Sequence, residues 1–462
     1  MQEIALSGKV KFFQKINQFQ WLILLLMAPL FLFIRPETTW VLVIVPLLWG
    51  ISLLAGEKPI KLTPVNGLIL LLAVQVLVSL YATYDIAISL PKIGGIVYSF
   101  ALLFAFVKLG ERFIGVLIST IVLCLAGLGM AGLGLLGTNW ATTKITILNP
   151  VYALFPRLQE MIPGMMDGFH PNEVAGAIIW VLPVWMVLFV WLVVRGKKML
   201  RIMKPIPLIG LVLVSFLAIG MIGIVLVFTQ SRSAYLGFAL GLVLMVFLLV
   251  PRKFKWLFVI LFVIALGALV FFVLNGQFML FINEMFPGSG LTTTAFSINT
   301  LSGRVEIWAR AIYAMQDFAF TGMGMNTFRH ILHVLYPLYT VSADVPVKDI
   351  GHAHNEFLQS ALDLGIPGMI AFIGINIAVF WMLLSKIKRV RHQSHRPIHI
   401  NEVLKREFYY VVCLGLIGGL FAHFLFGITD AIALGAKPGV VFWLMVAMAS
   451  SIFMKVQKRD FH

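Results

Sequence analysis

Long uninterrupted runs of apolar residues dominate this chain. About 20 residues, at roughly 1.5 Å each, cross a hydrocarbon core of about 30 Å, so a run of this length predicts a membrane-spanning helix. Twelve such runs follow one another: 19–35, 38–55, 64–82, 92–109, 112–136, 173–194, 206–228, 233–250, 256–275, 366–385, 408–429 and 438–454. We therefore predict an all-α polytopic membrane protein with about 12 transmembrane helices.

Two segments between these runs are long and more polar, at about 137–172 and 276–365. A loop as long as the second usually has structure and function of its own. It contains three helix-like pieces, at 304–316, 326–336 and 354–365. The chain thus divides into residues 1–275 with nine transmembrane helices, 276–365 as a large, partly helical outer loop, and 366–462 with the last three helices and a tail.

Composition agrees with a membrane protein. Hydrophobic residues make up 60% of the 462 residues and charged residues 12%, whereas soluble domains contain about 25% charged residues. Together with a mean hydropathy of +0.98, this excludes an ordinary water-soluble enzyme, a disordered chain and a fibrous protein. The first apolar run is too long for a signal peptide and no small-residue cleavage site follows it, so we expect no cleaved leader.

The formal net charge of +16 is unevenly distributed across the predicted membrane. Of the 35 Lys and Arg residues, 25 fall on the side that holds the N-terminus. This bias predicts that both termini are cytoplasmic, since basic residues concentrate on the cytoplasmic side. The basic face also favours anionic lipid headgroups, and no nucleic acid is needed to explain it.

Several kinds of site are disfavoured. Cys124 and Cys413 are the only cysteines and both lie in apolar runs, which predicts neither a disulfide framework nor a Cys-based zinc site. No Asp or Glu falls in the middle of a predicted span, which weighs against ion-coupled transport. His423 is the one ionisable residue deep in a span, and we expect it to be a packed or hydrogen-bonded core histidine.

Arg232 lies in the segment TQSRSAYLGF, at a very short outer turn between two spans. It either extends to lipid headgroups, as long cations at span ends often do, or serves a ligand. Its position on the less basic side and the neighbouring hydroxyl groups favour the second interpretation. A planar, permanently charged guanidinium that binds in a bidentate manner suits a diphosphate.

Arg304, in SGRVEIWARA, is expected at the start of a helix, where a basic residue opposes the helix dipole. Arg310 can pair with Glu306 on the helix surface, but Arg304 has no oppositely charged partner in helical register. Arg304 therefore either has a functional role or lies on a solvent-exposed face of the helix.

Two histidines lie where the long loop returns to the membrane, in GHAHNEFLQSALDLGIPG at 351–368. His354 is a candidate general base, because an unperturbed histidine titrates near neutrality. Asn355 is placed to orient a ring or hold a sugar hydroxyl. A metal site formed by His352 and His354 with Glu356 or Asp349 is weaker, because a helix carrying His354 would point the two rings apart; a structural role is the third alternative. A base beside two outer arginines suits glycosyl transfer, with the arginines holding an anionic lipid-linked leaving group.

At these residues the sequence resembles the O-antigen ligase and polymerase family of bacterial envelope enzymes. The matching pieces are SRSAYLGF, GRVEIW, GMGMNTF, HAHNEFLQSALDLGIPG and GFHPNEVAG at 168–176. The order of these pieces and the long penultimate outer loop agree as well.

The resemblance implies a membrane-embedded glycosyltransferase of the bacterial inner membrane. It would need no metal or cofactor and would act on the periplasmic or external face. Its donor would be a glycan linked to undecaprenyl diphosphate and its acceptor a lipid or glycan hydroxyl. By this resemblance His354 is the base, Arg232 and Arg304 hold the diphosphate, and His352 and Asn355 support them. From its position at the outer start of a span, we add Lys92 either as a third positive charge at the phosphate site or as a lipid-facing cation. Polymerisation of lipid-linked repeat units and non-enzymatic transport are the alternative functions.

Overall fold

The computed structural model describes residues 2–138, 140, 148–152, 168–275, 298–337, 350–392 and 400–457, and these are helical without any strand; one isolated bridge joins Thr138 and Phe169. The helices are α1 (Gln2–Gln18), α2 (Gln20–Leu32), η1 (Pro36–Val43), α3 (Ile44–Leu54), α4 (Asn66–Ala82), α5 (Ile86–Leu109), α6 (Phe113–Gly137), α7 (Asn149–Tyr152), α8 (Pro171–Ile179), α9 (Leu182–Val194), α10 (Gly196–Met199), α11 (Pro205–Thr229), α12 (Arg232–Leu249), η4 (Arg252–Phe254), α13 (Lys255–Leu274), α16 (Ile298–Asp317), α17 (Phe328–Leu335), α18 (Glu356–His392), α19 (Ile400–Gly427), η5 (Lys437–Gly439) and α20 (Val440–Gln457). The predicted helical fold class is confirmed.

The number of membrane crossings is supported only in part. Within the described ranges, nine helices are long and apolar enough to span a bilayer, or ten if the bent pair α1–α2 is one span. Two predicted spans form helices that are not among them: α4 has 17 residues, and α13 runs over Lys255–Leu274. The count of twelve therefore stays a prediction.

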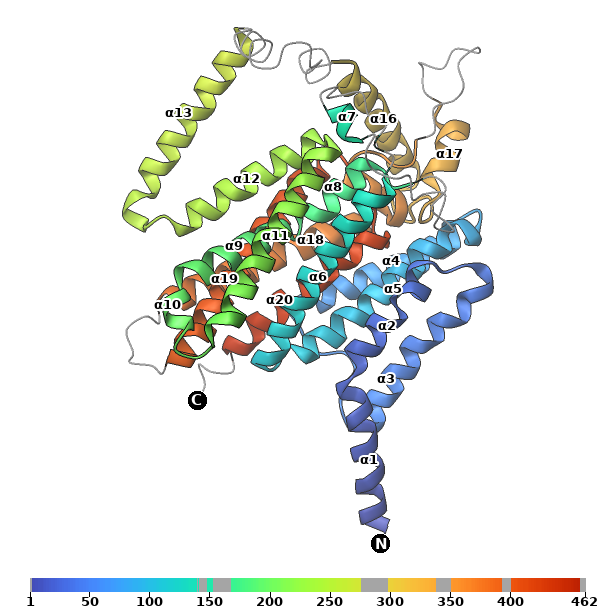
Figure 1. Cartoon of the computed structure of the whole chain (residues 1–462). Helices are drawn as coiled ribbons and strands as arrows, with labels where there is room; N and C mark the ends of the chain where they lie inside the picture. Colours follow the sequence, from blue (N-terminus) through green and yellow to red (C-terminus); the bar gives the residue numbers. More distant parts are fainter. Residues whose placement is uncertain are drawn as a thin grey trace.

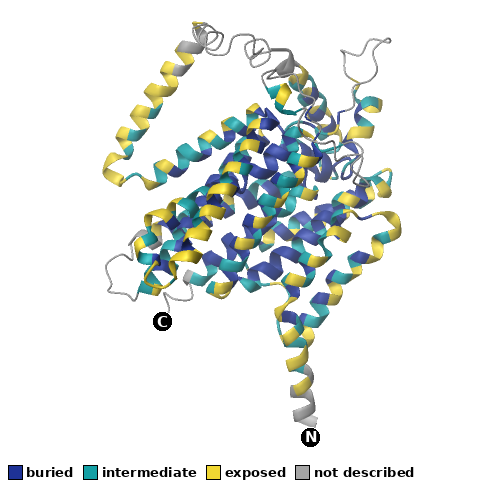
Figure 2. Cartoon of the chain, viewed as in Figure 1, coloured by how far each residue is buried: buried dark blue, intermediate teal, exposed yellow. Residues whose placement is uncertain are grey.

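Helix α19 lies at the centre of the bundle, where it packs against α9, α12 and α18. Helix α18 also packs against α4, and α20 packs against α5 (Figure 1). Figure 2 shows that buried residues concentrate in this centre, whereas α13 stands apart and is largely exposed. The start of α1 and the end of α20 lie on the lower side of Figure 1, and α7, α16 and α17 lie on the upper side.

The predicted outer-loop helices are present with shifted ends. Helix α16 begins six residues before Arg304, so Arg304 lies in its second turn rather than at its start. The expected helices at 354–365 and 366–385 form one element, α18, with a sharp kink at Gly365, whose φ is +72°. A Cβ at Gly365 would lie 2.5 Å from the Phe320 carbonyl oxygen, so glycine is required for both the backbone angle and the close approach.

The turn between α16 and α17, at 322–326, is docked against the tip of the α4–α5 hairpin. The backbone N–H of Met325 donates to Ser79 Oγ at 3.0 Å, and its carbonyl accepts from Ser89 Oγ at 2.7 Å. Asn326 donates from Nδ2 to the Ile88 carbonyl at 3.0 Å. These bonds fix α16 above the membrane bundle and thereby position its second turn.

Candidate active site

Asp430 is the centre of a cluster of polar side chains that come from four separate parts of the chain. Its Oδ2 accepts from Asn172 Nδ2 at 2.6 Å and lies 3.5 Å from a terminal guanidinium nitrogen of Arg304. Its Oδ1 accepts from the backbone N–H of Ala431 at 3.0 Å and lies 3.4 Å from His354 Nδ1. The carboxylate is buried, with 2% of its side chain exposed, so these donors replace water around it.

The two histidines lie side by side in an irregular loop before α18. Their ring centroids are 4.3 Å apart, and His352 Nδ1 accepts the backbone N–H of His354 at 3.1 Å. This bond leaves the ring proton of neutral His352 on Nε2, which lies 3.8 Å from Asp430 Oδ1. His354 has a φ of +47°, an unusual angle for a residue other than glycine. Trp308 supports this backbone by donating from Nε1 to the His354 carbonyl at 3.3 Å.

Asn355 holds the histidine loop to the loop that carries Asp430. Its Oδ1 accepts the backbone N–H of Leu358 at 2.9 Å, which is the bond of a helix N-cap, and helix α18 begins at the next residue. Its Nδ2 donates to the Ile428 carbonyl, also at 2.9 Å. The described contacts thus give Asn355 a role in positioning the two loops.

Arg232 lies on the same side of the bundle. A Cβ at Gly237 would meet the Ala422 carbonyl, and one at Gly241 would lie 2.9 Å from the Gly418 carbonyl. These approaches set an antiparallel register between α12 and α19. In that register Arg232, at the start of α12, is level with Gly427 at the end of α19.

Lys92, near the start of α5, is brought close to the loop that follows Asp430. A Cβ at Gly435 would meet the Lys92 backbone carbonyl, and Gly435 has a φ of +77°. The positive charge of Lys92 contributes to lowering the pKa of His352. The structure therefore brings His352, His354, Asn355 and Arg304 into one cluster, with Arg232 and Lys92 at its border.

The electrostatic environment of this cluster is positive. Asn172 in the first turn of α8 and Asn355 at the N-cap of α18 bring the amino ends of these two helices to the cluster, and such ends attract anions. Burial lowers the pKa of His352 to about 3, helped by the charges of His354, Lys92 and His170 and opposed by Asp430. Burial alone would raise the pKa of Asp430, but the nearby His354, His352 and Arg304 bring it below its usual value. His352 is therefore neutral and Asp430 ionised near neutral pH.

The expectation that helix geometry separates the two histidine rings is wrong, because α18 begins only at Glu356. Ligand atoms of His352, His354 and Asp430 lie within 4.8 Å of one another, as a bound metal ion would need. Glu356 is not part of this group, and Asp349 lies outside the described residues. Arg304, Lys92 and the amino ends of α8 and α18 oppose a cation there and favour an anion.

His423 is a hydrogen-bonded core histidine, as expected, but it also has a charged partner. Its Nδ1 lies 2.9 Å from the Gly176 carbonyl oxygen, and its Nε2 lies 3.2 Å from a carboxylate oxygen of Glu356. The ring stacks on Trp180 with centroids 3.7 Å apart. Glu356 and Asp363 are buried carboxylates in the part of α18 that precedes the kink at Gly365, before the predicted span 366–385 begins.

Sequence reasoning did not single out Asp430, although it directly follows the apolar run 408–429 on the side of the two histidines. This position at the outer end of a predicted span is the sequence feature that could have identified Asp430 as a site residue. The asparagine of GFHPNEVAG is Asn172, which donates to Asp430. The bond from Trp308 to the His354 carbonyl was also not expected from the sequence.

The family model described as O-antigen ligase matches residues 217–373, which carry Arg232, Arg304 and both histidines. No curated protein matches the chain. The family match supports assignment to the O-antigen ligase and polymerase family and a membrane glycosyltransferase activity of that type. With the nine apolar helices found among the described residues, it indicates a multi-pass bacterial membrane protein.

Proposed function

We propose that this protein transfers a glycan from undecaprenyl diphosphate to an acceptor hydroxyl on the outer face of the bacterial inner membrane, in the manner of an O-antigen ligase. His354 is the general base, and Arg232 and Arg304 hold the diphosphate. Lys92 adds a third positive charge. His352 and Asn355 support the site, which requires no metal or cofactor.

The observation that carries this proposal is the pairing of His354 with a buried carboxylate in positive surroundings. Because Asp430 lies 3.4 Å from Nδ1, Nε2 is the ring nitrogen left for an acceptor. The arrangement follows the general logic in which a carboxylate orients a histidine base. The surrounding cations and helix ends supply what an anionic leaving group needs.

The proposed step has simple chemistry. The acceptor hydroxyl gives its proton to Nε2 of His354 as its oxygen attacks the anomeric carbon of the donor sugar. The bond between that carbon and the diphosphate oxygen breaks, and its electron pair leaves with the diphosphate. The arginines stabilise the charge that develops on this leaving group, since guanidinium binds phosphate in a bidentate manner.

The distribution of basic residues supports the orientation, with both termini in the cytoplasm and the Asp430 cluster outside. The upper position of α16 and α17, opposite the start of α1 and the end of α20, agrees with it (Figure 1). The acceptor is a hydroxyl group of a lipid or a glycan. The family description favours a ligase, and a polymerase would use the same site with a lipid-linked repeat unit as acceptor.

The test uses purified wild type and His354→Ala in detergent, with and without EDTA, mixed with an undecaprenyl diphosphate-linked glycan and a crude acceptor lipid fraction. Release of free undecaprenyl diphosphate is measured. We expect release by the wild type alone, with glycan moved onto the acceptor lipid. A ladder of longer glycans on the carrier would indicate a polymerase instead. Equal release by both proteins, or release that EDTA abolishes, would contradict the proposed mechanism. No release by a folded wild type, with a donor that a known relative consumes, would favour transport.

A further inference from the structure

A groove of about 690 Å³ lies between α9, α12 and α19, far from the Asp430 cluster. Its walls are apolar side chains of these three helices, such as Val187, Met245 and Leu414. Its size is within the range of about 300–1,000 Å³ that small-molecule sites occupy. Val190 and Leu249 on its rim are half-exposed, so the groove opens toward the surroundings of the bundle.

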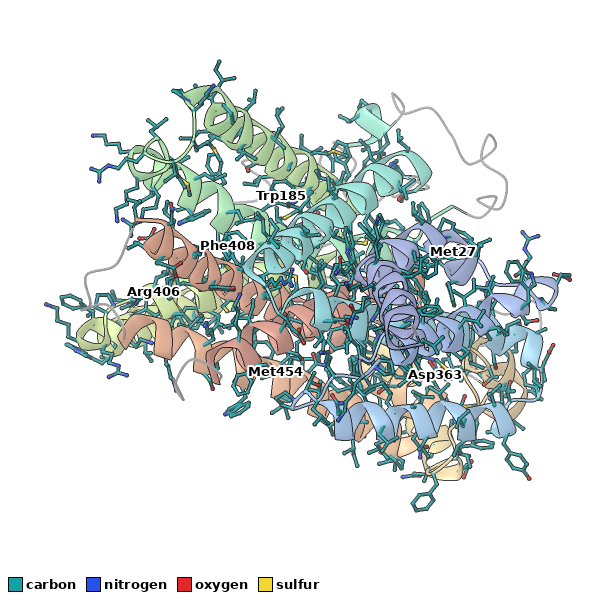
Figure 3. The ribbon with its side chains drawn as sticks, turned by 90° about the horizontal axis from the view of Figure 1, so that it is seen from below. Met27, Trp185, Asp363, Arg406, Phe408 and Met454 are labelled. Carbon is teal, nitrogen blue, oxygen red and sulfur yellow. The ribbon has the colours of Figure 1, made fainter. Side chains whose placement is uncertain are left out.

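One end of the groove is polar and carries a net positive charge. Arg195 and Arg406 line this end together with Glu407, and the Arg195 Nε lies 3.0 Å from a Glu407 carboxylate oxygen. Lys198 lies 3.6 Å from the other oxygen of the same carboxylate. Two basic groups therefore contact this one carboxylate, and Arg406 lines the same groove as a further basic residue. Figure 3 shows Arg406 near one edge of the molecule, well away from Asp363.

Two aromatic residues complete the polar end. Trp191 lines the groove and donates from Nε1 to a Glu407 carboxylate oxygen at 3.4 Å, and Tyr410 lies one turn further along α19. Tryptophan and tyrosine are enriched at the level of lipid headgroups, where one part of the side chain is apolar and the other is polar. The groove thus changes from apolar to cationic at the depth expected for a membrane surface.

Helix α19 relates the groove to the active site. About 20 residues separate Glu407 from Gly427, which at roughly 1.5 Å per residue is about 30 Å, the thickness of the hydrocarbon core. The cationic end of the groove therefore lies at the membrane surface opposite the Asp430 cluster. Basic pockets between transmembrane helices on the cytoplasmic side bind anionic lipid headgroups.

We propose that this groove binds one anionic phospholipid of the cytoplasmic leaflet, with an acyl chain along the apolar walls and its phosphate beside Arg195 and Arg406. Charge complementarity selects this occupant, because a zwitterionic lipid gains less from the net positive end. The binding is independent of the transfer chemistry and is expected to stabilise the contact of α19 with α9 and α12.

The test measures lipid binding to delipidated full-length protein in detergent by native mass spectrometry, with phosphatidylglycerol and phosphatidylcholine as probes. We expect one phosphatidylglycerol to bind at least about fivefold more tightly than phosphatidylcholine. Each removed arginine should weaken binding roughly fivefold, since a cation near anionic lipid contributes about 1 kcal/mol. Arg195→Gln with Arg406→Gln is the test variant, and Lys197→Gln, an exposed neighbour outside the groove, is the matched control.

A second variant keeps the test decisive if the double variant does not fold. Val190→Trp fills the groove from its exposed rim, and we expect it to lose the bound lipid while its melting temperature in lipid-free detergent stays near that of the wild type. Equal affinity for the two lipids would overturn the proposal, as would lipid binding unchanged by both variants. A lipid-free dimer that these variants dissociate would show that a second copy of the chain occupies the groove instead.

Discussion

Replacing Asp430 with asparagine removes one charge and leaves the shape of the side chain unchanged. Both carboxylate oxygens face donors: Oδ2 faces Asn172 and Arg304, and Oδ1 faces the Ala431 N–H and the two histidines. The new amide group must therefore point its N–H₂ at one of these sets. Whichever end it takes, the substitution leaves donors facing a donor and disturbs the orientation of His354.

The expected magnitude follows from the bonds that are lost. A hydrogen bond to a charged group contributes about 1.5–3 kcal/mol, so kcat should fall about 10- to 150-fold. The loss of a negative charge also makes the surroundings more positive. We therefore expect KM for the anionic donor to stay unchanged or to decrease. A lower kcat with an unchanged or lower KM distinguishes a positioning role in catalysis from a role in donor binding.

The assay measures undecaprenyl diphosphate release over a range of donor concentrations. Asp317→Asn is the control, since Asp317 is an exposed residue of the same outer helices that accepts a bond from Tyr336 at 2.5 Å. Thermal unfolding in detergent verifies that both variants fold. A folded Asp430→Asn protein with wild-type kcat would refute the orienting role, and so would a rise in KM without a change in kcat.

Three further predictions concern other parts of the account. Arg304→Lys and Arg232→Lys should each lower kcat/KM at least about tenfold, because lysine lacks the bidentate fork; near-normal activity in both would exclude diphosphate binding by these residues. The pKa of His352 is lowered to about 3 in the native protein, whereas an unfolded histidine titrates near pH 6.5. Below about pH 6.5 the unfolded chain therefore binds a proton that the native protein does not bind. Acidification then lowers the free energy of unfolding by up to about 1.4 kcal/mol per pH unit. The melting temperature should therefore drop more between pH 7 and pH 5 in the wild type than in His352→Gln, and equal drops would contradict this. Gly365→Ala should destabilise by about 1–3 kcal/mol through its backbone angle alone, measured by thermal unfolding against Gly303→Ala, a position with open space around it.

Much of the architecture follows from local sequence signals. Long apolar runs predicted helices, and the described residues contain helices at these positions. The reason is that a bilayer forces each backbone polar group to bond within its own segment. The loop helix at 326–336 was placed within two residues of its observed bounds, Phe328–Leu335. Gly365 was expected to end a helix, and its positive φ makes the kink of α18.

The centre of the candidate site could not be derived in this way. Arg304 lacks a partner in its own helix because its partner is Asp430, 126 positions away. The prediction of a helix that begins at His354 was also wrong. Asn355 is the N-cap of α18, so this helix begins two residues later and does not contain His354. Contacts of this kind depend on tertiary packing, which residue order alone does not specify.

The most direct test of the central claim separates donor binding from transfer in a His354→Asn protein. Binding of an undecaprenyl diphosphate-linked glycan is measured by native mass spectrometry, and release of the carrier is measured in the same preparation with EDTA present. The account predicts donor binding within a few-fold of the wild type and a rate of transfer lower by about 10²–10⁴, the contribution typical of a general base. Transfer at the wild-type rate would show that His354 is not the base and would contradict the account.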